Sequence, residues 1–134
     1  MAGIQRLTWQ VAKVLDALLT ARVNSDPDEQ KLHGYALIER TGLSGPSVYR
    51  ILDRLEDMDL VTAWWEPLTE DRDGPRKRCY VLNDKGIGAA YDAIRRYPPE
   101  VQRERQRTRL RRKASPELGT TLMVGLAAIA ERLR

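Results

Sequence analysis

Residues 33–58 carry two short amphipathic helical patterns separated by a tight turn. The first pattern, HGYALIERTG, ends at Gly42, which suits the left-handed position after a helix. Ser44 precedes the second pattern as a cap, and Pro46 is tolerated in a first helical turn, where its missing N–H would be unpaired anyway. Apolar residues repeat along the second pattern at helical spacing: Val48, Ile51, Leu52 and Leu55. Two helices joined by a short Gly-containing turn predict a helix-turn-helix.

The period of the apolar pattern changes after this pair of helices. LVTAWWEPL and RKRCYVL each predict a strand, and Asp73-Gly74-Pro75 between them predicts the turn of a β-hairpin. Two further helices are predicted, one capped by Thr8 and one that Asn83 caps and Pro98 ends. Between the first helix and the helix-turn-helix, residues 22–32 predict a loop with one helical turn. The order of elements predicts a winged helix-turn-helix, mainly α with a small β-hairpin.

The chain beyond residue 97 differs in composition, so we predict two parts, residues 1–97 and 98–134. Residues 100–113 are densely basic and are expected to form a solvated helix or an additional phosphate clamp. Ser115-Pro116-Glu117 then predicts a helix start. The apolar stripe of this last helix is Leu118, Leu122, Leu126, Ile129 and Leu133. Because an apolar stripe beyond a complete small domain needs a covering partner, we expect it to mediate dimerisation, with packing inside the same chain as the alternative.

Composition limits the possible chemistry. The 134-residue chain has a net charge of +4, which favours polyanionic partners without identifying one. Its one cysteine, Cys79, and one histidine, His33, give no metal site of typical spacing and no nucleophile with an evident base. The sequence therefore predicts no enzyme, no metal and no cofactor. No signal peptide or membrane-length apolar run is evident, so we expect a cytoplasmic protein without a membrane partner.

The N-terminal part of helix 44–58 is the expected base-reading element. Arg50 lies near the middle of its polar face and is predicted to contact a base, with guanine as the favoured partner. Ser44, Ser47 and Tyr49 are expected on phosphate or sugar, with Pro46 and Arg54 on the same surface. The alternative is that Arg50 pairs with Asp53 or points into solvent.

Two further groups extend this predicted DNA surface. The wing, residues 69–79, contributes the basic side chains Arg72, Arg76, Lys77 and Arg78, which are expected on the backbone or in the minor groove. At the start of the helix-turn-helix, Tyr35 belongs to the same surface, and His33 is expected to contact phosphate or to cap the helix. Trp64 and Trp65 are interpreted as packing residues, with a ligand pocket as the alternative.

The stretch from His33 to Gly86 resembles the PadR family of transcription regulators. The matching pieces are HGY, TGLSGPSVYRILDRLE, the tryptophan strand AWWE, GPRKRCYVLN and DKG. The resemblance implies a homodimeric repressor that binds a palindromic operator and dimerises through C-terminal helices. It also implies that Ser44, Ser47 and Tyr49 face DNA, and it suggests a small aromatic effector. Arg50 stands where the family often has Pro, and Cys79 replaces a common aromatic.

We therefore expect a sequence-specific, DNA-binding transcription regulator with double-stranded operator DNA and a second copy of itself as partners. The alternative is a winged-helix module that binds protein without specific DNA readout. Such a module would be expected to lack basic residues at the helix tip and the wing, and this sequence has them at both places.

Overall fold

A computed structural model describes residues 6–67 and 76–114 of the chain. The chain divides into two compact units, residues 1–102 and 103–134. The first unit contains, in order, α1 (Trp9–Arg22), the short 3-10 helix η1 (Pro27–Glu29), β1 (Leu32–His33), α2 (Gly34–Thr41), α3 (Gly45–Asp57), β2 (Val61–Trp65), β3 (Arg78–Leu82) and α4 (Asp84–Arg96). A further helix, α5 (Pro99–Lys113), begins in this unit and ends in the second.

The helices begin where the sequence places caps. The Thr8 hydroxyl accepts a hydrogen bond from the Val11 amide at the start of α1. Ser44 and Asn83 do the same for the third residue beyond them, at the starts of α3 and α4. These side-chain oxygens satisfy amide groups that have no partner within a helix. The three predicted helix starts are therefore confirmed.

The turn between α2 and α3 also follows the prediction. Gly42 adopts φ 69°, and its amide donates to the Ile38 carbonyl. This left-handed conformation costs glycine little, because glycine has no Cβ. Only Leu43 and Ser44 remain between Gly42 and the first residue of α3, and Leu43 is buried. The predicted helix-turn-helix is confirmed.

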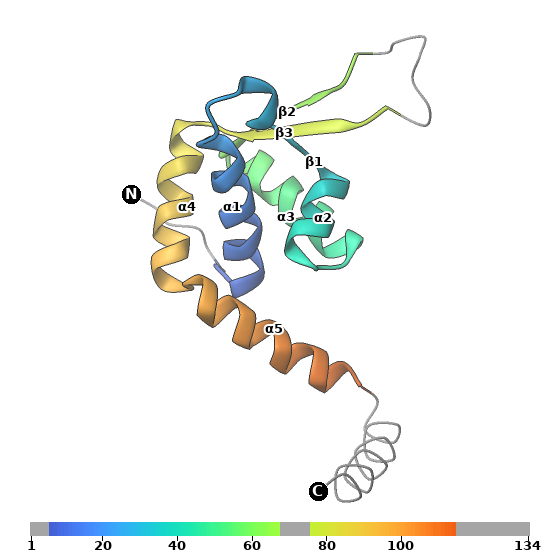
Figure 1. Cartoon of the computed structure of the whole chain (residues 1–134), viewed down its shortest axis with the longest axis vertical. Coiled ribbons are helices and arrows are strands. Elements are labelled where there is room, and N and C mark those ends of the chain that lie inside the picture. The colour runs from blue at the N-terminus through green and yellow to red at the C-terminus, as the bar shows by residue number, and fades with distance from the viewer. Residues whose placement is uncertain (1–5, 68–75, 115–134) are drawn as a thin grey trace, which may run out of the picture. The chain divides into compact units, whose positions relative to one another are not determined.

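The helices and strands of the first unit share one hydrophobic core. Figure 1 shows α1 between α4 and the pair α2 and α3, with the small sheet across the end of the helices. α1 contributes the largest share of buried residues, which are Val11, Ala12, Val14, Leu15, Leu18, Leu19 and Ala21. The α3 stripe of Val48, Ile51, Leu52 and Leu55 is buried as predicted. Because a helix with one buried stripe has a fixed rotation, the opposite face of α3 is fixed toward the surface.

The sheet contains the predicted hairpin and adds a third strand to it. β2 and β3 pair antiparallel, but β1 pairs with the other edge of β3, giving the order β1-β3-β2. A strand of two residues is too short to show alternation in a sequence, so its position depends on the pairing partner. The register places Leu32 opposite Tyr80 and His33 opposite Cys79. The tip of the hairpin, including Arg72, lies outside the described residues.

The junction between α3 and α4 is closed by backbone hydrogen bonds. Asp59 adopts φ 57°, and the Leu60 amide donates to the Leu55 carbonyl, which completes a left-handed helix end of the Schellman type. Gly86 packs against this turn. A Cβ at Gly86 would lie 2.0 Å from the Leu60 carbonyl oxygen, so only glycine fits there. The DKG motif therefore sets the contact between α4 and the start of β2.

Candidate nucleic-acid interface

The first turn of α3 presents several of the predicted contact residues. Ser44 donates from its hydroxyl to Ser47 Oγ over 2.9 Å, in addition to capping the helix. Ser47 is half-buried, whereas Pro46, Tyr49 and Arg50 are exposed. The amides of a first helical turn and the helix dipole favour an anion at this end. The tip of α3 is therefore suited to phosphate.

Arg50 lies on the polar face of α3. It is exposed, and it makes no hydrogen bond or ion pair with any residue in the described part of the chain. The pair with Asp53, one of the two alternatives, is not formed among the described residues, whereas the other alternative, an arginine that points into solvent, fits this exposure as well. Arg54, one turn further along, is half-buried and has an interaction within the chain. The two arginines of this helix therefore differ in how freely they can reach a ligand.

Tyr49 shows why the HGY motif contains a glycine. A Cβ at Gly34 would lie 2.5 Å from Tyr49 Cε1 and 2.7 Å from its hydroxyl, so the ring lies directly over Gly34. This contact fixes the start of α2 against the tip of α3. Tyr49 is 45% exposed and Tyr35 is 65% exposed, so both rings still reach the surface. We conclude that Gly34 positions Tyr49.

The His33 side chain is partly buried and is hydrogen-bonded within the domain. It occupies the residue before α2, but its side chain makes no capping hydrogen bond. Its Nε2 atom lies 3.0 Å from Glu66 Oε1, just beyond the end of β2. Because the imidazole is already hydrogen-bonded to this carboxylate, the structure favours a role for His33 at the base of the wing over capping or phosphate contact. The sequence offered no signal for this pair, since β1 was not predicted.

The basic residues of the wing also differ from one another. Arg78 donates to Glu56 of α3 over 2.5 Å, and its guanidinium lies 5.3 Å from the centre of the Trp65 ring. The hydrogen bond to Glu56 raises the pKa of Arg78 above its ordinary value, with burial acting in the opposite direction. Arg78 therefore ties the wing to the end of α3. The Trp65 ring is 51% exposed, so its contact with this guanidinium lies at the surface and not in the core.

Arg76 and Lys77 lie further toward the tip of the hairpin. Both side chains are exposed. The Nε atom of Arg76 donates to the Glu66 carbonyl, and the Glu66 amide donates to the Lys77 carbonyl, which extends the pairing of the two strands beyond β2 and β3. Arg76 and Lys77 are therefore exposed on a part of the hairpin where the two strands are still hydrogen-bonded to each other.

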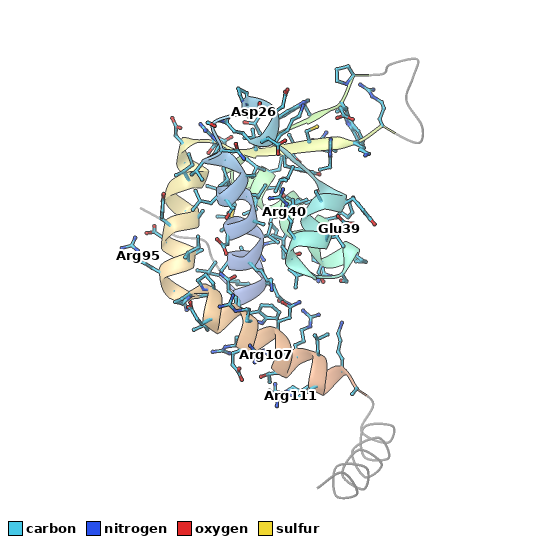
Figure 2. The ribbon with its side chains drawn as sticks, in the orientation of Figure 1. Asp26, Glu39, Arg40, Arg95, Arg107 and Arg111 are labelled. Atoms are coloured by element: carbon cyan, nitrogen blue, oxygen red, sulfur yellow. The ribbon has the colours of Figure 1, made fainter. Side chains whose placement is uncertain are left out.

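The basic helix α5 buries far fewer of its residues than the other α-helices do. Gln102 is its one buried residue among those described, and its side-chain amide donates to the Tyr97 carbonyl. Beyond Gln102 the helix is strongly charged, and Figure 2 shows Arg107 and Arg111 on it. Arg111 lies 3.9 Å from Glu104, and both side chains are mostly exposed. Residues 103–113 are therefore a solvated basic helix, and the predicted dimerisation residues beyond them lie outside the described residues.

The helix-turn-helix, the hairpin that follows it and α4 together define a winged-helix protein. Residues 27–91 match the PadR-like family of transcriptional regulators. The HGY, TGLSGPSVYR and DKG motifs that carry the predicted resemblance all lie within this stretch, which is slightly less than half of the chain. A match to a family of transcription regulators supports the prediction that the chain is not an enzyme.

Solved structures with a similar fold include the following two proteins. A mutant of MepR from a multidrug-resistant S. aureus clinical isolate is 15% identical, with a TM-score of 0.52 over 96% of this chain and 81% of that chain. The circadian clock associated protein Pex from anabaena is 22% identical, with a TM-score of 0.51 over 69% of this chain and 79% of that chain. At these identities the likeness concerns the fold alone. A search of curated proteins found no match.

Among the described residues, no helix combines the length and the apolar character needed to cross a bilayer.

Proposed function

We propose that this winged-helix regulator binds duplex DNA sequence-specifically through the tip of α3, with the β2–β3 hairpin as the wing. The observation that carries the proposal is the position of Arg50: it is exposed at the N-terminal end of a helix whose opposite face is buried. The recognition helix of a helix-turn-helix enters the major groove with these N-terminal residues. A bidentate arginine distinguishes guanine from the other bases in that groove.

The remaining proposed contacts come from two places, the tip of α3 and the wing. Around the helix tip, Ser44, Pro46, Ser47, Tyr49 and Tyr35 are proposed beside phosphate and sugar, with Arg54 at the edge of this surface. Arg72, Arg76 and Lys77 are proposed on the backbone or in the minor groove. Asp53 and Asp57 lie later in α3, so the exposed carboxylates are kept away from the tip.

The test is a binding titration with the duplex of the protein's own promoter and a scrambled duplex. Wild-type affinity is expected to fall steeply with salt, about one log–log unit per phosphate neutralised. Arg50→Ala is expected to lose about 1–3 kcal/mol of discrimination between the two duplexes. Arg95→Ala, which removes an exposed arginine from α4, is the matched control and should keep the discrimination. Equal discrimination by wild type and Arg50→Ala would remove Arg50 from base readout.

We also propose that the protein is a homodimeric repressor of a palindromic operator. Two helix-turn-helix units related by two-fold symmetry meet half-sites one or more DNA turns apart, so dimerisation doubles the contact surface. The proposed seam is the apolar stripe of residues 118–133. Deletion of residues 115–134 should yield a monomer by light scattering, with much weaker operator binding. An unchanged dimer would contradict this part of the proposal.

We also propose that a small aromatic compound binds the protein as an effector and changes its binding to the operator, because the family resemblance suggests such a compound. Release of the bound operator by a panel of small aromatic acids would support it. An operator complex that none of these compounds alters would remove this class of effector.

A further inference from the structure

The three strands bring together three side chains that are far apart in the sequence. His33 lies directly opposite Cys79 on β3, and on the other edge of β3 Cys79 lies opposite Trp64. Glu66 lies two residues beyond Trp64, so its side chain leaves the same face of the sheet. Side chains on one face reach both direct and diagonal neighbours across strands. His33, Cys79 and Glu66 therefore form one cross-strand cluster.

The distances within the cluster are close to those of a coordination site. His33 Nε2 lies 3.0 Å from Glu66 Oε1, and all three potential ligand atoms lie within 4.8 Å of one another. Two ligands of a tetrahedral zinc ion lie about 3.4 Å apart, given metal–ligand distances of about 2.0–2.3 Å. Rotations that move these atoms by about 1 Å bring the cluster to that spacing.

The donor set and its charge point to the same kind of ion. Imidazole nitrogen, thiolate sulfur and carboxylate oxygen are the three ligand types of zinc in proteins. A thiolate and a carboxylate together neutralise a divalent ion, so the occupied site carries no net charge to bury. Cys79 is 0% exposed, whereas the His33 and Glu66 side chains are 29% and 30% exposed. An ion can therefore approach from the histidine and carboxylate side, with the sulfur behind it.

We propose that His33, Glu66 and Cys79 bind one zinc-type divalent transition-metal ion at the base of the wing. The fourth position is left for water, which reaches the half-exposed side of the cluster. Binding replaces the proton of the Cys79 thiol, which is released to solvent. The ion would join β1, and through it the start of α2, to both strands of the hairpin.

The test is a titration of the full-length, reduced protein with Co²⁺, which substitutes for zinc and reports its ligands. A thiolate ligand gives an intense sulfur-to-cobalt charge-transfer band in the near ultraviolet. Because Cys79 is the chain's one cysteine, any such band identifies it. The expected result is a band that saturates at one ion per chain and disappears when Zn²⁺ is added. Absence of the band at a large excess of Co²⁺ would overturn the proposal.

Variants separate a metal site from a structural ion pair. Cys79→Ser should abolish the band, and His33→Gln and Glu66→Gln should each weaken Co²⁺ binding by at least about tenfold, since even outer-shell changes have effects of that size. The last two positions are half-exposed, so these variants carry the test if Cys79→Ser does not fold. Glu39→Gln, at an exposed position on α2, is the control and should bind as wild type. Unchanged affinity in both His33→Gln and Glu66→Gln would show that the two residues only pair with each other.

A second readout uses thermal stability, because an ion that binds only the folded state raises the melting temperature. Wild type should melt higher with Zn²⁺ than with a chelator, and His33→Gln should lose that difference. Neither measurement involves DNA, so failure of the metal proposal and failure of the DNA-binding proposal are distinguishable.

Discussion

The two ends of α3 differ in how many contacts they make with the rest of the domain. At the C-terminal end, the domain itself satisfies the exposed backbone: Lys85 donates to the Met58 carbonyl, and Asn83 donates to the carbonyls of Asp59 and Leu60. At the N-terminal end, Tyr49 and Arg50 are exposed, and Arg50 makes no polar contact within the described residues. We call the C-terminal end of α3 the held end, because hydrogen bonds from α4 and its cap fix it. We call the N-terminal end the presented end, because its Tyr49 and Arg50 side chains are exposed to solvent.

The difference indicates that position, more than charge, distinguishes Arg50, the arginine that we propose contacts DNA, from the other arginines of the domain. Arg78 and Arg50 carry the same charge, but Arg78 is bonded to Glu56 at the held end of the helix. The buried stripe between the two ends fixes the rotation of α3. A helix held in this way can offer its other end at a defined orientation, which sequence-specific readout requires. The basic helix α5 has more arginines but buries only Gln102 among its described residues.

The largest effect on stability is expected at the held end. Gly86→Ala places a Cβ against the Leu60 carbonyl and should lower the free energy of unfolding by about 1–3 kcal/mol, as overpacking does. Gly88→Ala, two residues along α4, meets no atom within 4 Å and should raise it by about 0.5–1 kcal/mol. Urea denaturation followed by circular dichroism measures both. Equal effects of the two variants would show that α4 does not hold this end.

A smaller effect is expected at the presented end, where Ser44 caps the helix. Ser44→Ala should lower the free energy of unfolding by about 1 kcal/mol, because the Ser47 amide loses its acceptor. Ser47→Ala removes a neighbouring hydroxyl that does not cap, and its effect should stay within about 0.5 kcal/mol. The same denaturation experiment compares them. If Ser47→Ala proved the more destabilising, the assignment of the cap would be wrong.

The smallest effect is expected for the ion pair that joins the wing to α3. Glu56→Gln should lower the free energy of unfolding by less than about 1 kcal/mol, because both partners are partly exposed. The loss should shrink at high salt, where ion pairs are screened. Glu104→Gln breaks the longer contact with Arg111 on α5 and should leave stability unchanged. A salt-independent loss for Glu56→Gln would indicate that packing of Arg78 on Trp65 matters more than its charge.

Most local features of the fold could be predicted from the sequence. The caps at Thr8, Ser44 and Asn83 and the left-handed Gly42 are all present. Each depends on residues within about four positions, so the chain carries the information locally. The exposure of Arg50 was predicted in the same way, because the buried stripe of α3 fixes which residues face outward.

The partners of His33 and Arg78 within the chain could not be predicted from local pattern. His33 pairs with Glu66, and Arg78 pairs with Glu56. These partners lie on different elements, and their proximity depends on how the strands and α3 pack. A two-residue strand such as β1 has no periodicity of its own, so nothing in the sequence indicated that His33 would lie beside the wing.

The sequence by itself determined the helix-turn-helix, the hairpin that follows it and the polar face on which Arg50 lies. Periodicity and capping act between near neighbours, and those are visible in a single chain. Only the tertiary structure decided the register of the three strands, and with it the cluster of His33, Glu66 and Cys79. A hydrophobic pattern sets the register of a longer strand, but β1 has only two residues, so its partner depends on packing between segments distant in the chain.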